Sequence, residues 1–199
     1  KKLVSIGHSV GLVLGGGNLV RGSGFAEVGD DRVVGDQMGM LATVMNALAL
    51  SSFLNRNQII NKVFSARGIA GVAQDYDKND ALEVLSSGRV GIFAGGTGNP
   101  FFTTDTAACL RAIELQCDIV VKATNVDGVY SSDPKTDRLA KKYDAITFNE
   151  VIEKDLSVMD MTAVLLCRDH KMPIIVCNID REDNLLRAAN GDPVGTKVS

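Results

Sequence analysis

The sequence predicts an α/β fold, a three-layer helix–sheet–helix sandwich with a mainly parallel central sheet. Short apolar runs rich in β-branched residues alternate with longer segments of helical pattern along most of the 199 residues. Strands spaced by helices form parallel β-α units, whose sheet is covered on both faces. Two of the strands end in glycine-rich segments, and ligands of such sheets collect at the carboxyl ends of strands.

The first half of the sequence contains three predicted strands. The long helix that follows the first of them is apolar on nearly every side, so we expect it between layers or at a subunit contact. Residues 1–8 resemble the end of a helix, and we expect a further element before them. In chain order, the predictions are a strand at 10–14, a helix at 39–54, a strand at 63–64, a helix at 79–87 and a strand at 90–94.

The second half continues the alternation. A helix is predicted where hydroxyl residues and an aspartate precede an apolar stretch, the chemistry of a helix N-terminus. The sequence contains no recognisable repeat or linker, so we expect a single domain over 1–199. In chain order, the predictions are a helix at 104–116, a strand at 119–123, a projecting loop or hairpin at 124–142, a helix at 157–170, a strand at 174–177, a helix at 184–189 and a tail containing glycine and proline.

The composition excludes several classes of protein. A hydrophobic share of 45% excludes a disordered chain, and a net charge of −3 argues against a general nucleic-acid binder. Four cysteines without C-x-x-C spacing and two histidines predict reduced thiols and no metal site. We find no signal peptide and no apolar run of membrane-spanning length, so we expect a cytoplasmic protein with no membrane partner.

The first glycine-rich segment, residues 15–22, follows the first predicted strand. It is neither a P-loop nor a G-x-G-x-x-G motif, but its glycines expose consecutive backbone N–H groups that can surround an anion. Arg21 adds a planar, permanent positive charge suited to a phosphate. The alternative is a tight strand-to-helix turn with a surface arginine.

The second segment, residues 95–105, repeats this design and adds polar side chains. Hydroxyl and amide groups at a helix start bind a phosphate without net positive charge. Such groups are present at Thr97, Asn99, Thr103 and Thr104. Thr103 or Thr104 should also cap the helix. Phe101 and Phe102 are more often core residues than base-stacking ones.

Two further segments are candidate nucleotide contacts. Asp36 lies in what we interpret as a glycine-flanked turn and could accept hydrogen bonds from ribose hydroxyls, or could simply cap a helix beginning near Gly39. After the strand at 119–123, polar side chains could form a nucleobase and ribose site, or an ordinary hairpin. These side chains are Thr124, Asn125, Tyr130 and Asp133.

In this order, the segments closely resemble the bacterial uridylate kinase family, a branch of the amino acid kinases. The segments that carry the resemblance are 15–22, 33–49, 94–108, 122–134 and 158–178, with GTGNPFFTTD the most specific. The resemblance implies an amino acid kinase-like α/β/α sandwich. It also implies transfer of the γ-phosphoryl group of ATP to UMP, giving UDP and ADP in pyrimidine biosynthesis.

The resemblance also assigns roles to residues. It implies catalytic roles for Arg21 and Asp105, with Mg²⁺ carried by the nucleotide and no metal site of the protein's own. The implied UMP contacts are Gly16, Asp36, Thr97, Gly98, Asn99, Pro100, Phe101, Phe102, Thr103 and Thr104. The implied ATP contacts are Gly17, Arg21, Thr124, Asn125, Tyr130 and Asp133.

The family is typically homohexameric, activated by GTP and inhibited by UTP, and Lys62 and Arg89 fall where it often has basic residues near the effector site. Its members begin with a strand that carries a K-x-S-G-E motif, which this sequence lacks. We expect that segment to be left out of the sequence and not lost in evolution. Two alternatives stay open: another amino acid kinase acting on carbamate, acetylglutamate or aspartate, and a non-catalytic nucleotide-binding protein.

Overall fold

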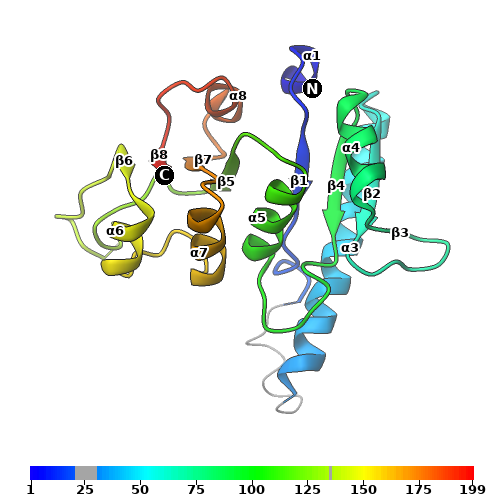
Figure 1. The fold of residues 1–199 in the computed structure, drawn as a ribbon, viewed down its shortest axis with the longest axis horizontal. Helices are drawn as coiled ribbons and strands as arrows, with labels where there is room; N and C mark the ends of the chain where they lie inside the picture. Colours follow the sequence, from blue (N-terminus) through cyan, green and yellow to red (C-terminus); the bar gives the residue numbers. More distant parts are fainter. Residues whose placement is uncertain (21–30, 135) are drawn as a thin grey trace. The chain divides into compact units, whose positions relative to one another are not determined.

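The computed structural model describes residues 1–20, 31–134 and 136–199. The chain divides into two compact units, Lys1–Ala108 and Cys109–Ser199 (Figure 1). Each unit has its own four-stranded sheet. The single domain over 1–199 stays a prediction.

The sheet of the first unit is wholly parallel, in the order β1-β4-β2-β3. Strand β4, one of the two inner strands, is buried along its whole length, as its unbroken apolar sequence predicts. The predicted strands at 10–14, 63–64 and 90–94 are confirmed as β1, β2 and β4, whereas β3 was not predicted. The strands are β1 (Gly11–Val13), β4 (Val90–Ala94), β2 (Asn61–Ser65) and β3 (Gln74–Asp75).

Helices cover both faces of this sheet (Figure 1). On one face, Val44 and Ala47 of α3 (Arg32–Arg56) pack against Ile92 of β4. On the other face, α4 (Lys78–Ser86) contacts β4 and β2, and the Phe93 ring stacks on that of Phe64 with centroids 5.6 Å apart. Alternation of side chains along β4 therefore produces the three layers that the sequence predicts.

Of the two helices nearest the N-terminus in the described ranges, one confirms its prediction and the other begins earlier than predicted. The short α1 (Lys2–Ser5) confirms helical structure at residues 1–8. Helix α3 begins at Arg32 and not near Gly39, because the Asp31 carboxylate accepts hydrogen bonds from the N–H groups of Val33 and Val34 and caps the helix there.

By length and composition alone, α3 could cross a membrane, contrary to our expectation that no apolar run reaches that length. This is weak evidence, because core helices of soluble proteins meet the same criterion. Its contacts with β2 and β4 make it a layer of the first unit.

The sheet of the second unit has the order β5-β7-β8-β6, with one antiparallel pair, β7 and β8. The strands predicted at 119–123 and 174–177 are confirmed as β5 and β7, whereas β6 and β8 were not predicted. The strands are β5 (Val120–Thr124), β7 (Ile174–Asn178), β8 (Thr196–Val198) and β6 (Ala145–Ile146).

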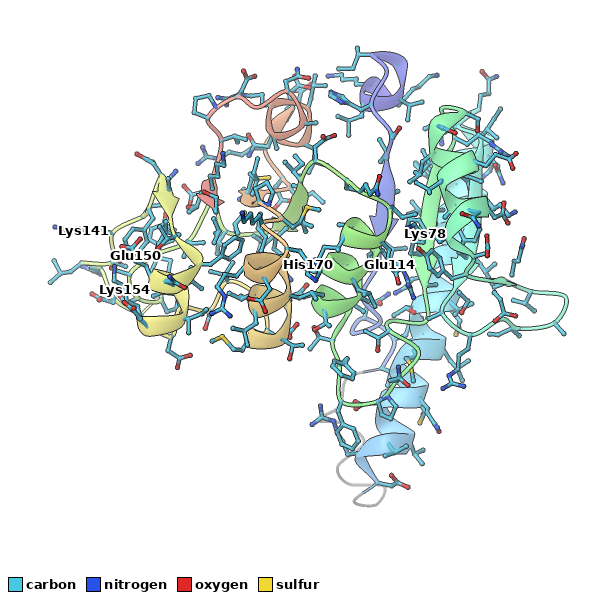
Figure 2. The ribbon with its side chains drawn as sticks, viewed as in Figure 1. Lys78, Glu114, Lys141, Glu150, Lys154 and His170 are labelled. Carbon is cyan, nitrogen blue, oxygen red and sulfur yellow. The ribbon has the colours of Figure 1, made fainter. Side chains whose placement is uncertain are left out.

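Helices cover both faces of this second sheet as well. Helices α6 (Phe148–Glu153) and α7 (Met161–Asp169) bury Val151 and Val164 against Ile174, while α8 (Asn184–Ala189) buries Ala188 against Ile175. The short α6 was not predicted; the side chains of Glu150 and Lys154 bond to each other at its end (Figure 2).

Helix α5 (Thr104–Glu114) begins in the first unit and ends in the second. Its start agrees with the prediction for residues 104–116. Helix α7 begins later than predicted for 157–170, because Asp160 caps it by accepting a hydrogen bond from the Ala163 N–H. The hairpin expected at 124–142 is present in part, as a bridge between Tyr130 and Lys142.

Candidate functional site

The two glycine-rich turns meet at one edge of the first unit's sheet. They follow β1 and β4, which are parallel neighbours, so both leave the sheet at its carboxyl edge. A methyl group added to Gly15 would lie 3.9 Å from the hydroxyl oxygen of Thr104. The described part of the first turn therefore converges with the second turn at the edge where ligands of such sheets collect.

Helix α3 holds the first turn. The side-chain amide of Asn46 donates a 2.7 Å hydrogen bond to the carbonyl of Gly15 and pairs with the amide of Asn18. Gly16 is buried against the same helix, where an added Cβ would lie 2.7 Å from the carbonyl oxygen of Gly39. Only glycine fits there. Arg21, the predicted phosphate ligand, lies outside the described residues.

The second turn needs glycine for a different reason. Gly95, Gly96 and Gly98 have φ angles of 76°, 58° and 80°, in the left-handed region that favours glycine. No described residue accepts a hydrogen bond from the N–H of Gly96 or Thr97. Consecutive N–H groups in such a turn can surround an anion, and anion binding at this turn stays a prediction.

Three hydrogen bonds from other parts of the first unit hold this second turn. The Gly95 N–H donates to the hydroxyl of Thr43 at 2.8 Å, and the Phe101 N–H donates to Asp36 at 2.7 Å. Between them, the Arg67 Nε–H donates to the carbonyl of Gly98 at 2.8 Å. Three bonds from distant residues therefore fix the shape of the turn.

Asp36 lies inside α3, so both sequence interpretations of its position, a glycine-flanked turn and a helix cap, were wrong. The residues before Gly39 carry too few apolar side chains to predict a helix, and Asp31 caps it instead. Each carboxylate oxygen of Asp36 accepts from Arg32 Nε at 3.1 Å. The Arg32 guanidinium also lies 5.8 Å from the centre of the Phe101 ring, within range of a cation–π contact.

Phe101 and Phe102 do not belong to the core. Their exposed fractions are 63% and 48%. Phe101 also has a φ of 70°, which is uncommon for a bulky residue, and its N–H is bonded to Asp36. The two rings are accessible to a ligand, and their stacking on a base stays a prediction.

The start of α5 is the last part of the candidate site in the first unit. The hydroxyl of Thr103 accepts from the N–H groups of Asp105 and Thr106 at 3.1 and 3.4 Å, so Thr103 caps the helix as expected. Thr104 is the first helical residue and Asp105 lies in the first turn. Thr97 and Asn99 bond to each other, the Asn99 N–H donating to the Thr97 hydroxyl at 3.2 Å.

The second unit holds the residues predicted to contact adenosine. Thr124 ends β5, and the side-chain amide of Asn178, at the end of the neighbouring β7, donates to the carbonyl of Asn125 at 3.1 Å. These groups lie at the carboxyl edge of the parallel β5-β7 pair, where ligands are expected.

Tyr130 and Asp133 lie in the loop beyond. The Tyr130 hydroxyl donates to Asp127 at 2.6 Å, which lowers the pKa of the Asp127 carboxyl and raises that of the Tyr130 phenol. The carbonyl of Asp133 accepts from the Thr136 N–H at 3.1 Å. Their contact with a nucleotide stays a prediction.

Three residues that hold the glycine turns were not recognised in the sequence. Thr43 and Asn46 are polar residues three apart in an otherwise apolar helix, a spacing that places them on one face and could have marked them. Arg67 has no such signal, because its partner, Gly98, is far away in the sequence.

The chain matches known proteins over its whole length. Residues 1–178 match the model of the amino acid kinase family. The chain is 54% identical to the uridylate kinase of Vibrio cholerae serotype O1 over 199 residues, all of this chain and 82% of that protein. It is 55% identical to the uridylate kinase of Pseudomonas syringae pv. syringae, covering 99% of this chain and 80% of that one.

A solved structure agrees with these sequence matches. The UMP kinase of Bacillus anthracis superposes with a TM-score of 0.96 at 38% identity, over 99% of this chain and 82% of that one. The chain therefore shares its fold with a similar solved structure.

Proposed function

Because the chain belongs to the amino acid kinase family, we propose that it is a UMP kinase, which transfers the γ-phosphoryl group of ATP to UMP and forms UDP and ADP. The observation that carries this proposal is the convergence of the two glycine turns at one sheet edge. The relatives named uridylate kinase match the chain across both turns.

The acceptor nucleotide binds to the second turn and its surroundings. The N–H groups of Gly96 and Thr97 and the start of α5 receive the UMP phosphate, since N–H groups and a helix N-terminus both favour an anion. Asp36 accepts from the ribose hydroxyls, and the exposed rings of Phe101 and Phe102 lie beside the base. The remaining contacts are those that the resemblance implies: Gly16, Gly98, Asn99, Pro100, Thr103 and Thr104.

The chemistry requires positioning more than proton transfer. The attacking group is a phosphate oxygen that is ionised near neutral pH, so no strong general base is needed. Catalysis rests on in-line placement and on neutralising the charge of the moving phosphoryl group. Arg21 and the glycine N–H groups supply donors for this, and Gly17 in the first turn is a further expected ATP contact.

The donor nucleotide takes its adenosine contacts from the second unit: Thr124, Asn125, Tyr130 and Asp133. Mg²⁺ arrives with ATP, because this ion is usually bound through phosphate oxygens and one or two carboxylates. Asp105, a carboxylate in the first turn of α5, fits that requirement.

Helix α3 suggests how copies of the chain assemble. It exposes a row of large apolar side chains along its length, and such rows on a soluble protein usually mark a contact with another protein. We infer that this row is covered in a homohexamer, located in the cytoplasm. The row consists of Val34, Leu41, Met45 and Leu48.

Regulation by GTP and UTP would involve Lys62 and Arg89. Both are already engaged in ion pairs, Lys62 with Asp80 at 2.6 Å and Arg89 with Glu83 at 3.7 Å. A nucleotide effector would compete with these carboxylates for the same cations.

The test is an assay of the complete protein with ATP and each candidate acceptor: UMP, carbamate, acetylglutamate and aspartate. We expect UDP from UMP and no comparable turnover with the others. Binding of both nucleotides without UDP would instead indicate a non-catalytic protein. Replacing Arg21 with alanine should lower turnover by roughly 10²-fold or more, and near-normal turnover would remove Arg21 from the mechanism.

A further inference from the structure

We propose that Arg67 is a positioning residue for the acceptor site, which sets UMP affinity by holding the peptide between Gly98 and Asn99. The inference rests on the proposed function, since it concerns the same glycine turn. Arg67 lies in the loop between β2 and β3 and is far from the turn in sequence.

The contact fixes the orientation of one peptide unit. The Arg67 Nε–H donates to the Gly98 carbonyl at 2.8 Å. Because a trans peptide is planar, fixing this carbonyl also fixes the Asn99 N–H, which points the opposite way and donates to the Thr97 hydroxyl at 3.2 Å. One bond from Arg67 therefore also fixes the donor that holds the Thr97 hydroxyl, one of the polar groups that we assign to the acceptor.

Arg67 also contributes packing and charge. A methyl group added to Gly98 would lie 3.6 Å from Arg67 Cγ, so the side chain lies close along the turn. No carboxylate within the described ranges pairs with its guanidinium. Its positive charge is thus available to attract an anionic acceptor toward the turn.

The backbone of the Arg67 loop is itself held in place. The Gly68 N–H donates to the Asp75 carboxylate at 2.6 Å, and a Cβ added to Gly68 would lie 2.6 Å from Asp75 Cγ. Two backbone bonds between Ile69 and Ala73, of 2.9 and 3.0 Å, close the loop. Asp75 belongs to β3, so the sheet fixes the base from which Arg67 reaches the turn.

The test compares substrate affinities of variants of the complete protein. Arg67→Ala should raise the KM for UMP about tenfold, the value of one charge-assisted hydrogen bond, and leave the KM for ATP within about twofold. Arg67→Lys should restore part of the loss, because an ammonium group can still donate to the carbonyl. Lys78→Ala is the control. It removes a positive charge at the start of α4 in the same unit, and Lys78 makes none of the contacts described for Arg67 (Figure 2).

A double-substitution cycle tests the role of Asp75. Asp75→Ala should raise the KM for UMP less than Arg67→Ala does. Combined, the two should raise it no more than Arg67→Ala alone, because both act through one contact. Additive effects would show that Asp75 acts independently of Arg67.

The proposal is overturned if Arg67→Ala keeps the wild-type KM for UMP, or if both KM values rise together as the melting temperature falls. Calorimetric titration of UMP into wild type and Arg67→Ala gives the same comparison without turnover. Wild type that binds UMP but forms no UDP would refute the proposed catalysis and leave this binding comparison decisive. Wild type that binds no UMP would overturn both.

Discussion

The backbone N–H of Phe101 donates a 2.7 Å hydrogen bond to Oδ2 of Asp36, 65 residues earlier in the chain. The bond joins the second turn of a long helix to the loop that leads into α5. Arg32 reinforces it by binding the same carboxylate and lying against the Phe101 ring. The carboxylate that we assign to the ribose therefore also shapes the loop that we assign to the base and phosphate.

Replacing Asp36 should weaken UMP binding more than it slows the chemical step. Asp36→Ala removes the acceptor for Phe101 and the proposed ribose contact, so we expect the KM for UMP to rise about tenfold or more with a smaller change in kcat. Asp36→Asn retains an acceptor oxygen and should have a smaller effect. Steady-state kinetics with varied UMP measure both.

The control for Asp36 is Gln37→Ala, an exposed neighbour on the same helix. It should behave as wild type. A wild-type KM in Asp36→Ala would show that this carboxylate contributes nothing to acceptor binding.

Adjacent glycines in the first turn should respond differently to alanine. Gly16→Ala forces a Cβ to within 2.7 Å of the Gly39 carbonyl oxygen and 2.9 Å of Ala42 Cβ, whereas a Cβ on Gly17 meets nothing within 4 Å. Overpacking of this kind costs about 1–3 kcal/mol. Urea unfolding should therefore show a clear loss for Gly16→Ala and almost none for Gly17→Ala. Equal stability of the two variants would contradict the close approach of the turn to α3.

The exposed row on α3 should control assembly. Met45→Glu places a charge on a side chain that is 60% exposed in a single chain, and burial of that charge between copies is unfavourable. We expect light scattering to show a smaller assembly than in wild type. Leu139→Glu, at a residue that is 84% exposed in the second unit, serves as the control and should leave the mass unchanged. An unaltered mass in Met45→Glu would place the subunit contact elsewhere.

The Tyr130–Asp127 bond should give stability that depends on pH. The bond lowers the pKa of Asp127 in the folded state, so its contribution is complete above the ordinary aspartate value of about 3.9 and is lost as the pH falls through the lowered folded value. The pKa of Tyr130 is raised, so the phenol's contribution is complete below its ordinary value of about 10 and is lost at higher pH.

Urea unfolding from acid to neutral pH tests this dependence. The stability difference between wild type and Tyr130→Phe should be constant from about pH 5 to 8 and shrink below about pH 4. In Asp127→Asn, which has no carboxyl to titrate at this position, Tyr130→Phe should change the free energy of unfolding by the same amount throughout the acid range. A difference that grows on acidification would refute the assignment.

The central strands and their glycine turns could be predicted because each signal lies within a few residues of sequence. An apolar β-branched run that stops at glycine, as at Ala94 and Gly95, marks both the strand and its exit. The start of α3 could not be predicted in this way, because Gly35 and Gly39 suggest a turn and only the cap at Asp31 reveals the helix. Strand β8, at Thr196–Val198, is too short to show alternation.

The contacts that shape the site depend on distant residues, and this limits what one sequence shows. Thr43 meets Gly95 and Arg67 meets Gly98 because the folded sheet brings these distant residues together. The residue types at the site were visible in the sequence; the hydrogen-bond partners that orient them were not.

The three bonds that hold the segment from Gly95 to Phe101 all join groups of the protein itself. Ordering a mobile backbone costs about 1–2 kcal/mol per residue in conformational entropy, and here that cost falls on folding and not on association. An acceptor analogue without its uracil ring would therefore still meet a well-ordered turn. Its weaker binding would measure the missing contacts alone.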